Sequence, residues 1–170
     1  MTQREPDVRG VAEPPTPQAD AETLSQLEEE LDESQPDAPR VGIVMGSKSD
    51  MPEMEKAGAE LDERGISHEM RVMSAHRDPE MVADYARNAR MRGLKVIIAG
   101  AGLSAALPGV CAAHTDLPVI GVPLTAKNSA AGGLDALLAS VQMPPGVPVA
   151  CVGLNSARNA AVLAARIIDC

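Results

Sequence analysis

The chain has 170 residues, enough for one domain with a substantial core and few for two domains of ordinary size. It contains one tyrosine and no phenylalanine or tryptophan, so it lacks the aromatic platforms on which single-stranded nucleic acids stack. The formal net charge is -9, and residues 1–40, with 11 acidic and 3 basic side chains, carry most of it. The remaining charges nearly cancel and form no basic stripe, so we expect no nucleic-acid partner.

Residues 1–39 differ in composition from the rest of the chain. They hold six of the 14 prolines and most of the excess negative charge. Leu24, Leu27 and Leu31 recur at helical spacing and would allow a short amphipathic helix, but low hydrophobicity and dense charge favour disorder. We therefore predict an acidic, proline-rich, disordered tail over 1–39 and one α/β domain over 40–170.

The sequence indicates a cytoplasmic protein without a membrane partner. The acidic N-terminus has no apolar stretch typical of a signal peptide, and no run approaches the roughly 20 apolar residues that span a bilayer. Cys111, Cys151 and Cys170 are odd in number and widely spaced, which predicts reduced thiols. Their spacing fits no metal-ligand pattern, so we expect no metal site.

From Arg40 onward, apolar runs typical of β-strands alternate with stretches of helical pattern. The runs cover 41–46, 68–73, 94–100, 117–122 and 148–153. The helical stretches cover 51–64, 79–92, 105–114, 132–141 and 156–168. This alternation predicts right-handed crossovers and a parallel sheet with helices on both faces, which is a three-layer doubly wound (Rossmann-like) α/β fold.

In an open sheet of this kind, ligands collect at the carboxyl ends of the strands, near the point where the strand order reverses. The loops that follow the first four runs are therefore the candidates for a functional site. Their sequences are GSKSD, SAHRDP, GAGLSAALPG and PLTAKNSAAGG.

The first of these loops places small and hydroxyl side chains before a helix. Gly46 ends the strand, and Ser47 lies in the turn that follows. Asp50 is the expected N-cap of the helix, with Glu53 at the capping-box position. Free backbone N–H groups at such an N-terminus also suit a phosphate. The residues alone leave open an ordinary capped turn and an anion site.

The second loop places a histidine beside an arginine. Ser74 ends the strand, and Asp78 followed by Pro79 is expected to begin the next helix. His76 and Arg77 then lie between them, at the ligand edge of the sheet. Arginine can form a bidentate bond with a phosphate or carboxylate, and histidine is the usual group for moving a proton near neutral pH. From the residues alone, His76 is either an ordinary loop histidine or a general acid–base.

The third loop is rich in glycine and alanine. Gly100 and Gly102 would let the backbone approach a ligand closely, but they do not identify it. A dinucleotide loop is one interpretation, although no acidic residue follows at the end of a next strand, as the NAD fingerprint requires. The other two histidines, His68 at a strand start and His114 at a helix end, are expected to be structural.

Five motifs, in this order along the chain, together resemble one family. VMGSKSD, SAHR, IIAGAG with LPG, GVP and VQMPPGVPVA are similar to the N5-carboxyaminoimidazole ribonucleotide mutase family of purine (IMP) biosynthesis. The likeness covers 41–168 and leaves out the tail. It implies a flavodoxin-like fold, usually assembled as a homo-octamer, that moves a carboxylate from the exocyclic nitrogen to carbon 4 of an aminoimidazole ribonucleotide. It also implies that no metal, biotin or nucleotide cofactor is used.

The resemblance gives each loop residue a role. His76 would be the general acid and base of a catalytic domain, and Ser47, Asp50 and Arg77 would hold the ribonucleotide. Other substrate-binding or pocket-lining positions implied by the motifs are Gly46, Ser74, Gly100, Ala101 and Gly102. QMPPG, at 142–146, would close the edge of the pocket. The transfer leaves a proton to be removed at carbon 4 and must keep released CO2 from solvent, so one imidazole in a closed apolar pocket suits it.

Two features depart from the family pattern. Bacterial mutases typically have GGAAHLPG in the third loop, where this chain has Ala106 in place of the histidine and Leu103 and Ser104 in place of small residues. The chain also ends at Cys170, without the long C-terminal helix of many relatives, which leaves the oligomer size open. Besides the mutase, we retain an aminoimidazole ribonucleotide carboxylase that uses CO2 directly. A third hypothesis is a noncatalytic nucleotide-binding module, which would need Arg77 but not His76.

Overall fold

A five-stranded parallel sheet forms the centre of the computed structural model, which describes residues 38–170. The strand order is β2-β1-β3-β4-β5, and each neighbouring pair is parallel. This is the flavodoxin-like order, so the predicted doubly wound fold is confirmed. The tail predicted over 1–39 lies outside the described residues except for Ala38 and Pro39.

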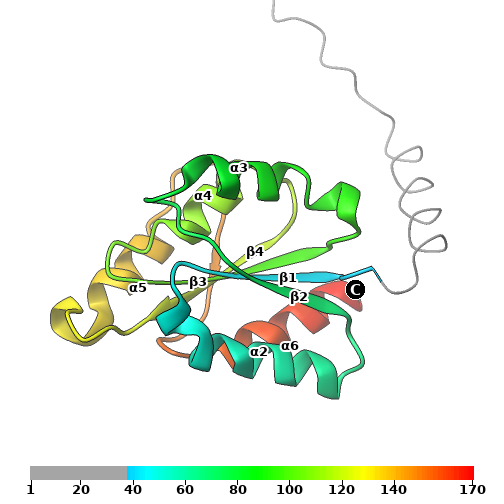
Figure 1. Ribbon diagram of the computed structural model, residues 1–170, viewed down its shortest axis with the longest axis horizontal. Coiled ribbons are helices and arrows are strands. Elements are labelled where there is room, and N and C mark those ends of the chain that lie inside the picture. The colour runs from blue at the N-terminus through cyan, green and yellow to red at the C-terminus, as the bar shows by residue number, and fades with distance from the viewer. Residues whose placement is uncertain (1–37) are drawn as a thin grey trace, which may run out of the picture.

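Strands and helices alternate along the described chain (Figure 1). The strands are β1 (Val41–Met45), β2 (His68–Val72), β3 (Val96–Gly102), β4 (Val119–Leu124) and β5 (Ala150–Cys151). The helices are α2 (Met51–Glu63), α3 (Pro79–Arg87), α4 (Leu107–Ala113), α5 (Leu134–Val141) and α6 (Ala157–Ile168). Each connection between consecutive strands therefore contains a helix, as parallel pairing requires.

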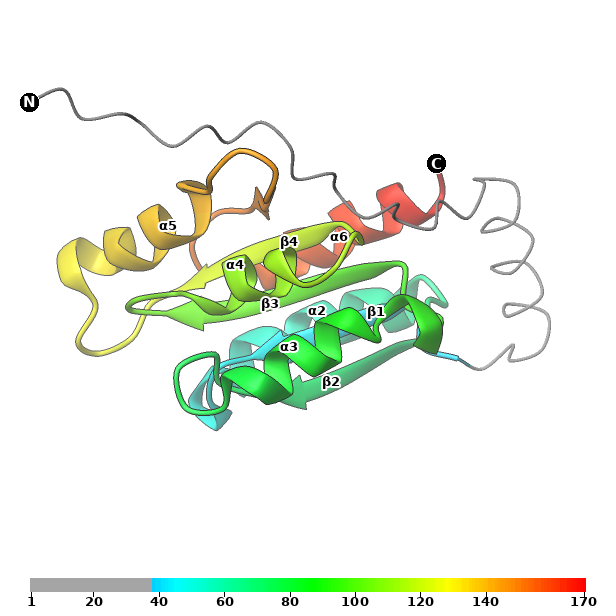
Figure 2. The same ribbon diagram turned by 90° about the horizontal axis from the view of Figure 1, so that it is seen from above.

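Helices cover both faces of the sheet and build a core on each. In Figure 1, α3 and α4 lie above the sheet, and α2 and α6 lie below it. Figure 2, seen from above, shows the strands side by side beneath α3 and α4. Strands β1, β3 and β4 are buried along nearly their whole length, which explains why valine and isoleucine occur on both of their faces.

The two cores are packed almost without aromatic side chains. Beneath the sheet, α6 presents small side chains to the strands, namely Ala157, Ala160, Ala161, Ala164 and Ala165, all of them buried. Above the sheet lies Tyr85, the single aromatic residue, whose hydroxyl donates a hydrogen bond to Glu69 Oε1 at 2.8 Å. Gly42 makes room for this hydroxyl, because a Cβ at Gly42 would lie 2.2 Å from it.

Two elements differ most from the lengths that their sequence patterns predict. The helix expected over 79–92 ends at Arg87, where the Asn88 side chain donates to the Asp84 carbonyl at 2.9 Å; a separate turn of 3-10 helix, Arg90–Arg92, follows. The strand expected over 148–153 pairs only at Ala150–Cys151. Both differences arise where local hydrogen bonding or an edge position outweighs the apolar pattern.

The cysteines are unpaired, as the sequence predicts. Cys111 is buried within α4, and burial raises the pKa of its thiol to about 12. It therefore stays protonated and unreactive at neutral pH. Among residues 38–170, the helices are all too short or too polar to cross a bilayer.

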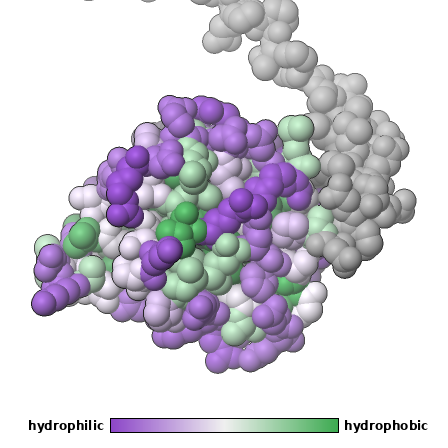
Figure 3. All heavy atoms as spheres, in the orientation of Figure 1, coloured by the Kyte–Doolittle hydropathy of each residue, from purple (hydrophilic) through white to green (hydrophobic). Residues whose placement is uncertain are grey.

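Some large apolar side chains remain on the surface. The space-filling view shows a mostly polar face with a small apolar patch near its middle (Figure 3). Elsewhere, α5 exposes Leu134, Leu138 and Val141, which recur at the spacing of one side of a helix. Leu103 is also exposed, at 43%, in the loop after β3.

Candidate active site

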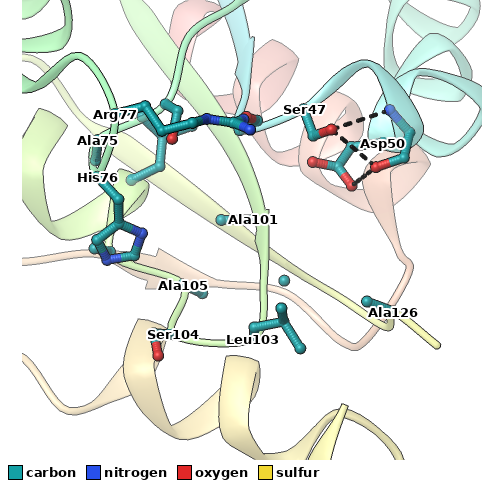
Figure 4. Close-up of a pocket in the computed structure, with 16 residues that line it drawn as sticks. Ser47, Asp50, Ala75, His76, Arg77, Ala101, Leu103, Ser104, Ala105 and Ala126 are labelled. Carbon is teal, nitrogen blue, oxygen red and sulfur yellow. Dashed lines mark hydrogen bonds between the residues drawn. The ribbon is translucent and has the colours of Figure 1, made fainter. Parts of the chain in front are cut away.

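A pocket lies where the carboxyl ends of β1, β2 and β3 meet, with the end of β4 beside them (Figure 4). Its volume is about 420 Å³. β2 and β3 pair with opposite edges of β1, so the direction in which strands are added to the sheet reverses at β1. The pocket therefore lies at the topological switch point. The lining residues are Gly46, Ser47, Ser49, Asp50, Ser74, Ala75, His76, Arg77, Ala101, Gly102, Leu103, Ser104, Ala105, Ala106, Leu107 and Ala126.

The first wall is the loop between β1 and α2, which is held by its own hydroxyl groups. Ser47 is extended, and its Oγ accepts bonds from the Ser49 backbone N–H at 3.3 Å and from the Ser49 hydroxyl at 3.0 Å. Asp50 begins α2 but makes no side-chain capping bond, so the expected capping box does not form. The Asp50 carboxylate is thereby left in the pocket rather than used by the helix.

Partial burial makes that carboxylate easier to protonate. Desolvation raises the pKa of Asp50 above its ordinary value of 3.8, and it outweighs hydrogen bonds from Ser47 and Ser49 and the nearby charge of Arg77. A carboxylate that is half-buried and imperfectly satisfied is a strong acceptor for ligand hydroxyls. Asp50 can therefore bind a sugar hydroxyl or position a cationic group.

The second wall is the loop between β2 and α3, which the structure caps as the sequence predicts. Asp78 accepts a hydrogen bond from the Met81 backbone N–H at 3.4 Å, and Pro79 begins the helix. Arg77 reaches across to the first wall, where its Nη2 donates to the Gly46 carbonyl at 2.7 Å. This bond holds the guanidinium over the pocket and ties the two loops together.

His76 comes from the same loop but points elsewhere. In Figure 4, Arg77 extends toward Ser47, whereas the His76 ring extends toward the segment with Ser104 and Ala105. The ring is exposed and has no hydrogen-bond partner among residues 38–170. Both of its nitrogens are therefore available to a ligand in the pocket.

The third wall, between β3 and α4, is strained. Leu103 has a φ of 54°, in the left-handed region, which costs a residue with a side chain about 1–2 kcal/mol. The Ala105 backbone N–H donates to the Leu103 carbonyl at 2.9 Å and closes a tight turn. Gly102, just before it, packs closely, because a Cβ there would lie 3.0 Å from the Leu124 carbonyl oxygen.

Comparison with known proteins agrees with this arrangement. Residues 40–170 match the family model described as AIR carboxylase. The chain belongs to the AIR carboxylase family. An N5-carboxyaminoimidazole ribonucleotide mutase from Pyrococcus abyssi is 57% identical over 131 residues, 77% of this chain and 74% of that protein. The resemblance to the N5-carboxyaminoimidazole ribonucleotide mutase family, inferred from the motifs, is thereby confirmed.

Two further relatives extend the comparison. A phosphoribosylaminoimidazole carboxylase from Schizosaccharomyces pombe is 53% identical over 132 residues, 78% of this chain but 24% of that longer protein. The crystal structure of Treponema denticola PurE superposes with a TM-score of 0.67 at 34% identity, covering 77% of this chain and 80% of that one. The AIR carboxylase family thus includes relatives under both a mutase and a carboxylase name.

Most of the substrate-binding residues expected from the motifs surround one pocket. His76, Arg77, Ser74, Gly46, Ser47, Asp50, Ala101 and Gly102 all line it. Gly100 does not line it: the residue is buried in β3, and a Cβ there would lie 2.4 Å from Met54 Sδ. It lets α2 lie close to the sheet, beneath the pocket rather than in it. The roles assigned to these residues stay predictions.

QMPPG, expected to close the pocket edge, packs elsewhere in this chain. Met143 contacts α4, where a Cβ on Gly109 would lie 3.0 Å from the Met143 methyl carbon. None of residues 142–146 lines the pocket. The two other histidines also lie away from it: His68 Nδ1 is 3.5 Å from Asp62 Oδ1 at the opposite end of β2, and His114 follows α4.

Some lining residues could be predicted only from the position of their loop. The motifs give Ser49 and Ala126 no role of their own, but both lie in loops that follow strands and were therefore candidates. Leu103 carried a signal only as a departure from the family pattern. No group of three or more histidine, cysteine, aspartate or glutamate side chains among residues 38–170 is arranged to hold a metal ion.

Proposed function

We propose that this chain is an N5-carboxyaminoimidazole ribonucleotide mutase of purine biosynthesis, an isomerase that acts in the pocket at the β1/β3 switch point. One observation carries the proposal: His76 and Arg77, adjacent in sequence, reach the same pocket as Asp50 from a different loop. The reaction moves a carboxylate between two atoms of an aminoimidazole ring that carries a phosphorylated ribose, so it needs a proton carrier, a cation to bind the phosphate and an acceptor for the ribose hydroxyls. The mutase name of relatives 53–57% identical supports the same choice.

The charges of the pocket suit such a substrate. Arg77 is the one arginine or lysine among the residues that line it, and its guanidinium can form two parallel bonds with a phosphate or carboxylate. The Ser47 and Ser49 hydroxyls and backbone N–H groups lie beside the start of α2, where an anion is favoured. Asp50 then remains for the ribose hydroxyls.

His76 can carry the proton through both halves of the reaction. As the bond between the exocyclic nitrogen and the carboxylate carbon breaks, the imidazolium donates its proton to that nitrogen, which releases CO2. Carbon 4 of the ring then attacks CO2, and the new bond leaves a proton on carbon 4. His76 removes this proton, the ring regains its aromaticity, and the imidazolium is restored.

The second candidate is direct carboxylation of aminoimidazole ribonucleotide. Ala106 lines the pocket where bacterial mutases typically have a histidine, and an alanine cannot bond a carboxylate held on the exocyclic nitrogen. The carboxylase name of the Schizosaccharomyces pombe relative belongs to this alternative. We favour the mutase because relatives 53–57% identical over most of this chain carry the mutase name, whereas the match covers only 24% of the longer carboxylase.

One experiment separates the two candidates. Purified protein is given either N5-carboxyaminoimidazole ribonucleotide or aminoimidazole ribonucleotide with bicarbonate, and the formation of the 4-carboxylated product is followed. We expect turnover with the first donor and little with the second. Ala106→His is the matched variant, and it should shift the ratio of donors further toward the first. A wild type that used bicarbonate efficiently and ignored the N5-carboxy compound would overturn the choice.

A homo-oligomer in the cytoplasm belongs to the same proposal. The apolar side of α5, formed by Leu134, Leu138 and Val141, is exposed on the single chain and suits burial against another copy. The octamer implied by the family resemblance is the assembly that we expect. Sedimentation of the wild type and of Leu138→Glu tests it: the wild type should be larger than a monomer, and the variant should be smaller than the wild type.

A further inference from the structure

Leu103 has two features that lower the stability of the fold. Its φ of 54° belongs to a region that glycine or asparagine occupies at lower cost, yet the residue is a leucine. Its side chain is 43% exposed, although leucine is stabilising when buried. Strained residues that persist in this way cluster at functional sites, so an observed outlier directs attention to what the side chain does.

The surroundings of Leu103 narrow the possibilities. Leu103 lines the pocket, and Figure 4 shows its side chain low in the view, between Ser104 and Ala126 and on the side away from Arg77. The remaining apolar lining is small, since it consists of alanines together with Leu107, which is 2% exposed. Leu103 is therefore the one large apolar side chain of the described lining that is free to cover a ligand.

The chemistry proposed above gives such a cover a purpose. CO2 is uncharged and apolar while it is detached from nitrogen and not yet bonded to carbon 4, so neither Arg77 nor any hydrogen bond can hold it strongly. It is kept in place by excluding water and by leaving no open path to solvent. Bacterial mutases typically have small residues in this loop, so the leucine isobutyl group gives the pocket of this chain additional apolar cover.

We propose that Leu103 forms the apolar wall that keeps released CO2 beside carbon 4, so that it is recaptured rather than lost. This inference rests on the proposed mutase reaction. It makes Leu103 a determinant of the outcome of each turnover: recapture gives the 4-carboxylated ribonucleotide, and escape gives aminoimidazole ribonucleotide and CO2. Atoms balance in both outcomes, because escape leaves on nitrogen the proton that His76 donated.

The test measures how the released CO2 is partitioned. N5-carboxyaminoimidazole ribonucleotide labelled in its carboxylate is supplied together with unlabelled bicarbonate, and the label in the 4-carboxylated product and the amount of aminoimidazole ribonucleotide are determined. Decay in a sample without enzyme is subtracted. Leu103→Asn has nearly the same size and accepts a positive φ but is polar, Leu103→Ala shortens the side chain, and Leu103→Met keeps its apolar bulk.

We expect the wild type and Leu103→Met to retain the label. In Leu103→Asn and Leu103→Ala, the ratio of released to recaptured carboxylate should rise about tenfold, the scale of losing apolar contacts in a pocket. The melting temperature of Leu103→Asn should equal or exceed that of the wild type, because asparagine tolerates the backbone angle. A structural role would instead lower the melting temperature and leave the partition unchanged.

The outcomes separate this inference from the proposed function. If the wild type forms no 4-carboxylated product from the N5-carboxy compound, the proposed function fails. If the wild type turns over and Leu103→Asn and Leu103→Ala both retain the label as it does, the role of Leu103 is overturned. Should Leu103→Asn not fold, Leu103→Ala decides alone against Leu103→Met.

Discussion

The loops on the two sides of the pocket are built on different principles. Those after β1 and β2 satisfy their own backbone: Ser47 bonds the Ser49 N–H, Asp78 caps α3, and Arg77 bonds the Gly46 carbonyl. The loop after β3 instead places Leu103 at a positive φ with an exposed apolar side chain. The loops after β1 and β2 thus supply polar groups in fixed positions. The loop after β3 places an apolar side chain in the pocket wall at a cost in backbone stability.

We expect the largest effect from replacing His76, which tests whether the loops with fixed polar groups contain the catalytic acid–base. His76→Asn should lower kcat by at least about two orders of magnitude, the scale of removing a general acid–base, while ribonucleotide binding is kept. Steady-state rates and a binding titration measure the two effects. His114→Asn, a histidine away from the pocket, is the matched control and should behave as the wild type. Normal turnover by His76→Asn would show that His76 is not the general acid–base and that the loop between β2 and α3 is an ordinary capped turn.

Arg77→Ala should have the next largest effect. Loss of a charged hydrogen-bond donor costs about 1.5–3 kcal/mol, so we expect KM to rise about 10-fold to 100-fold with a smaller change in kcat. Arg77→Lys keeps the charge but not the planar pair of donors and should be intermediate. A fall in kcat with an unchanged KM would contradict an anion-binding role for Arg77. It would also mean that Arg77 and His76 do not have the separate roles proposed for them.

Asp50→Asn tests how the polar side affects stability, because burial disfavours the charged form of the Asp50 carboxyl and raises its pKa. Burial raises the pKa of Asp50, so the folded chain binds this proton more tightly than the unfolded chain, and ionised Asp50 lowers stability as pH rises through its folded pKa. The variant should therefore melt higher than the wild type at pH 7. This difference should shrink as pH falls toward the ordinary value of 3.8. Thermal unfolding at several pH values measures it, and an unchanging difference would refute the assignment.

Deleting residues 1–37 should have the smallest effect. The deletion keeps Ala38, whose carbonyl accepts a hydrogen bond from the Ser67 hydroxyl at 2.7 Å, and it leaves every described pocket residue in place. We expect kcat and KM to stay within about twofold of the full chain, because changes at chain termini are often tolerated. Loss of most turnover would show that the acidic segment contributes to catalysis.

Much of this arrangement could be predicted from sequence, for a physical reason. Alternating apolar runs and helical stretches fix a parallel sheet, and the rule for its carboxyl edge then selects the loops that hold His76 and Arg77. Capping residues such as Asp78 could be identified because a cap is a local interaction between neighbours in the chain. Such features need no knowledge of which distant residues meet.

The features that sequence did not reveal depend on distant contacts or on conformational cost. Gly100 suggested a backbone close to a ligand, but its missing side chain makes room for Met54 of α2. The capping box at Asp50 and Glu53 fits its pattern and still does not form. A 3-10 turn, Lys48–Asp50, precedes α2, so Asp50 has a helical backbone (φ -86°, ψ -15°) and not the extended backbone of a capping residue. Leucine is among the residues least expected at a positive φ, so no propensity could assign Leu103 its backbone angle.

The solitary Tyr85 has a practical consequence for spectroscopy. With no tryptophan in the chain, ultraviolet fluorescence comes from one side chain, buried between α3 and the edge strand β2 and hydrogen-bonded to Glu69. Burial and this bond raise the pKa of its hydroxyl, so the phenol stays protonated over the working range of pH and its signal follows local packing. The protein thus carries a built-in optical reporter at one edge of the sheet, and its weak absorbance leaves the spectrum of a bound aminoimidazole easy to observe.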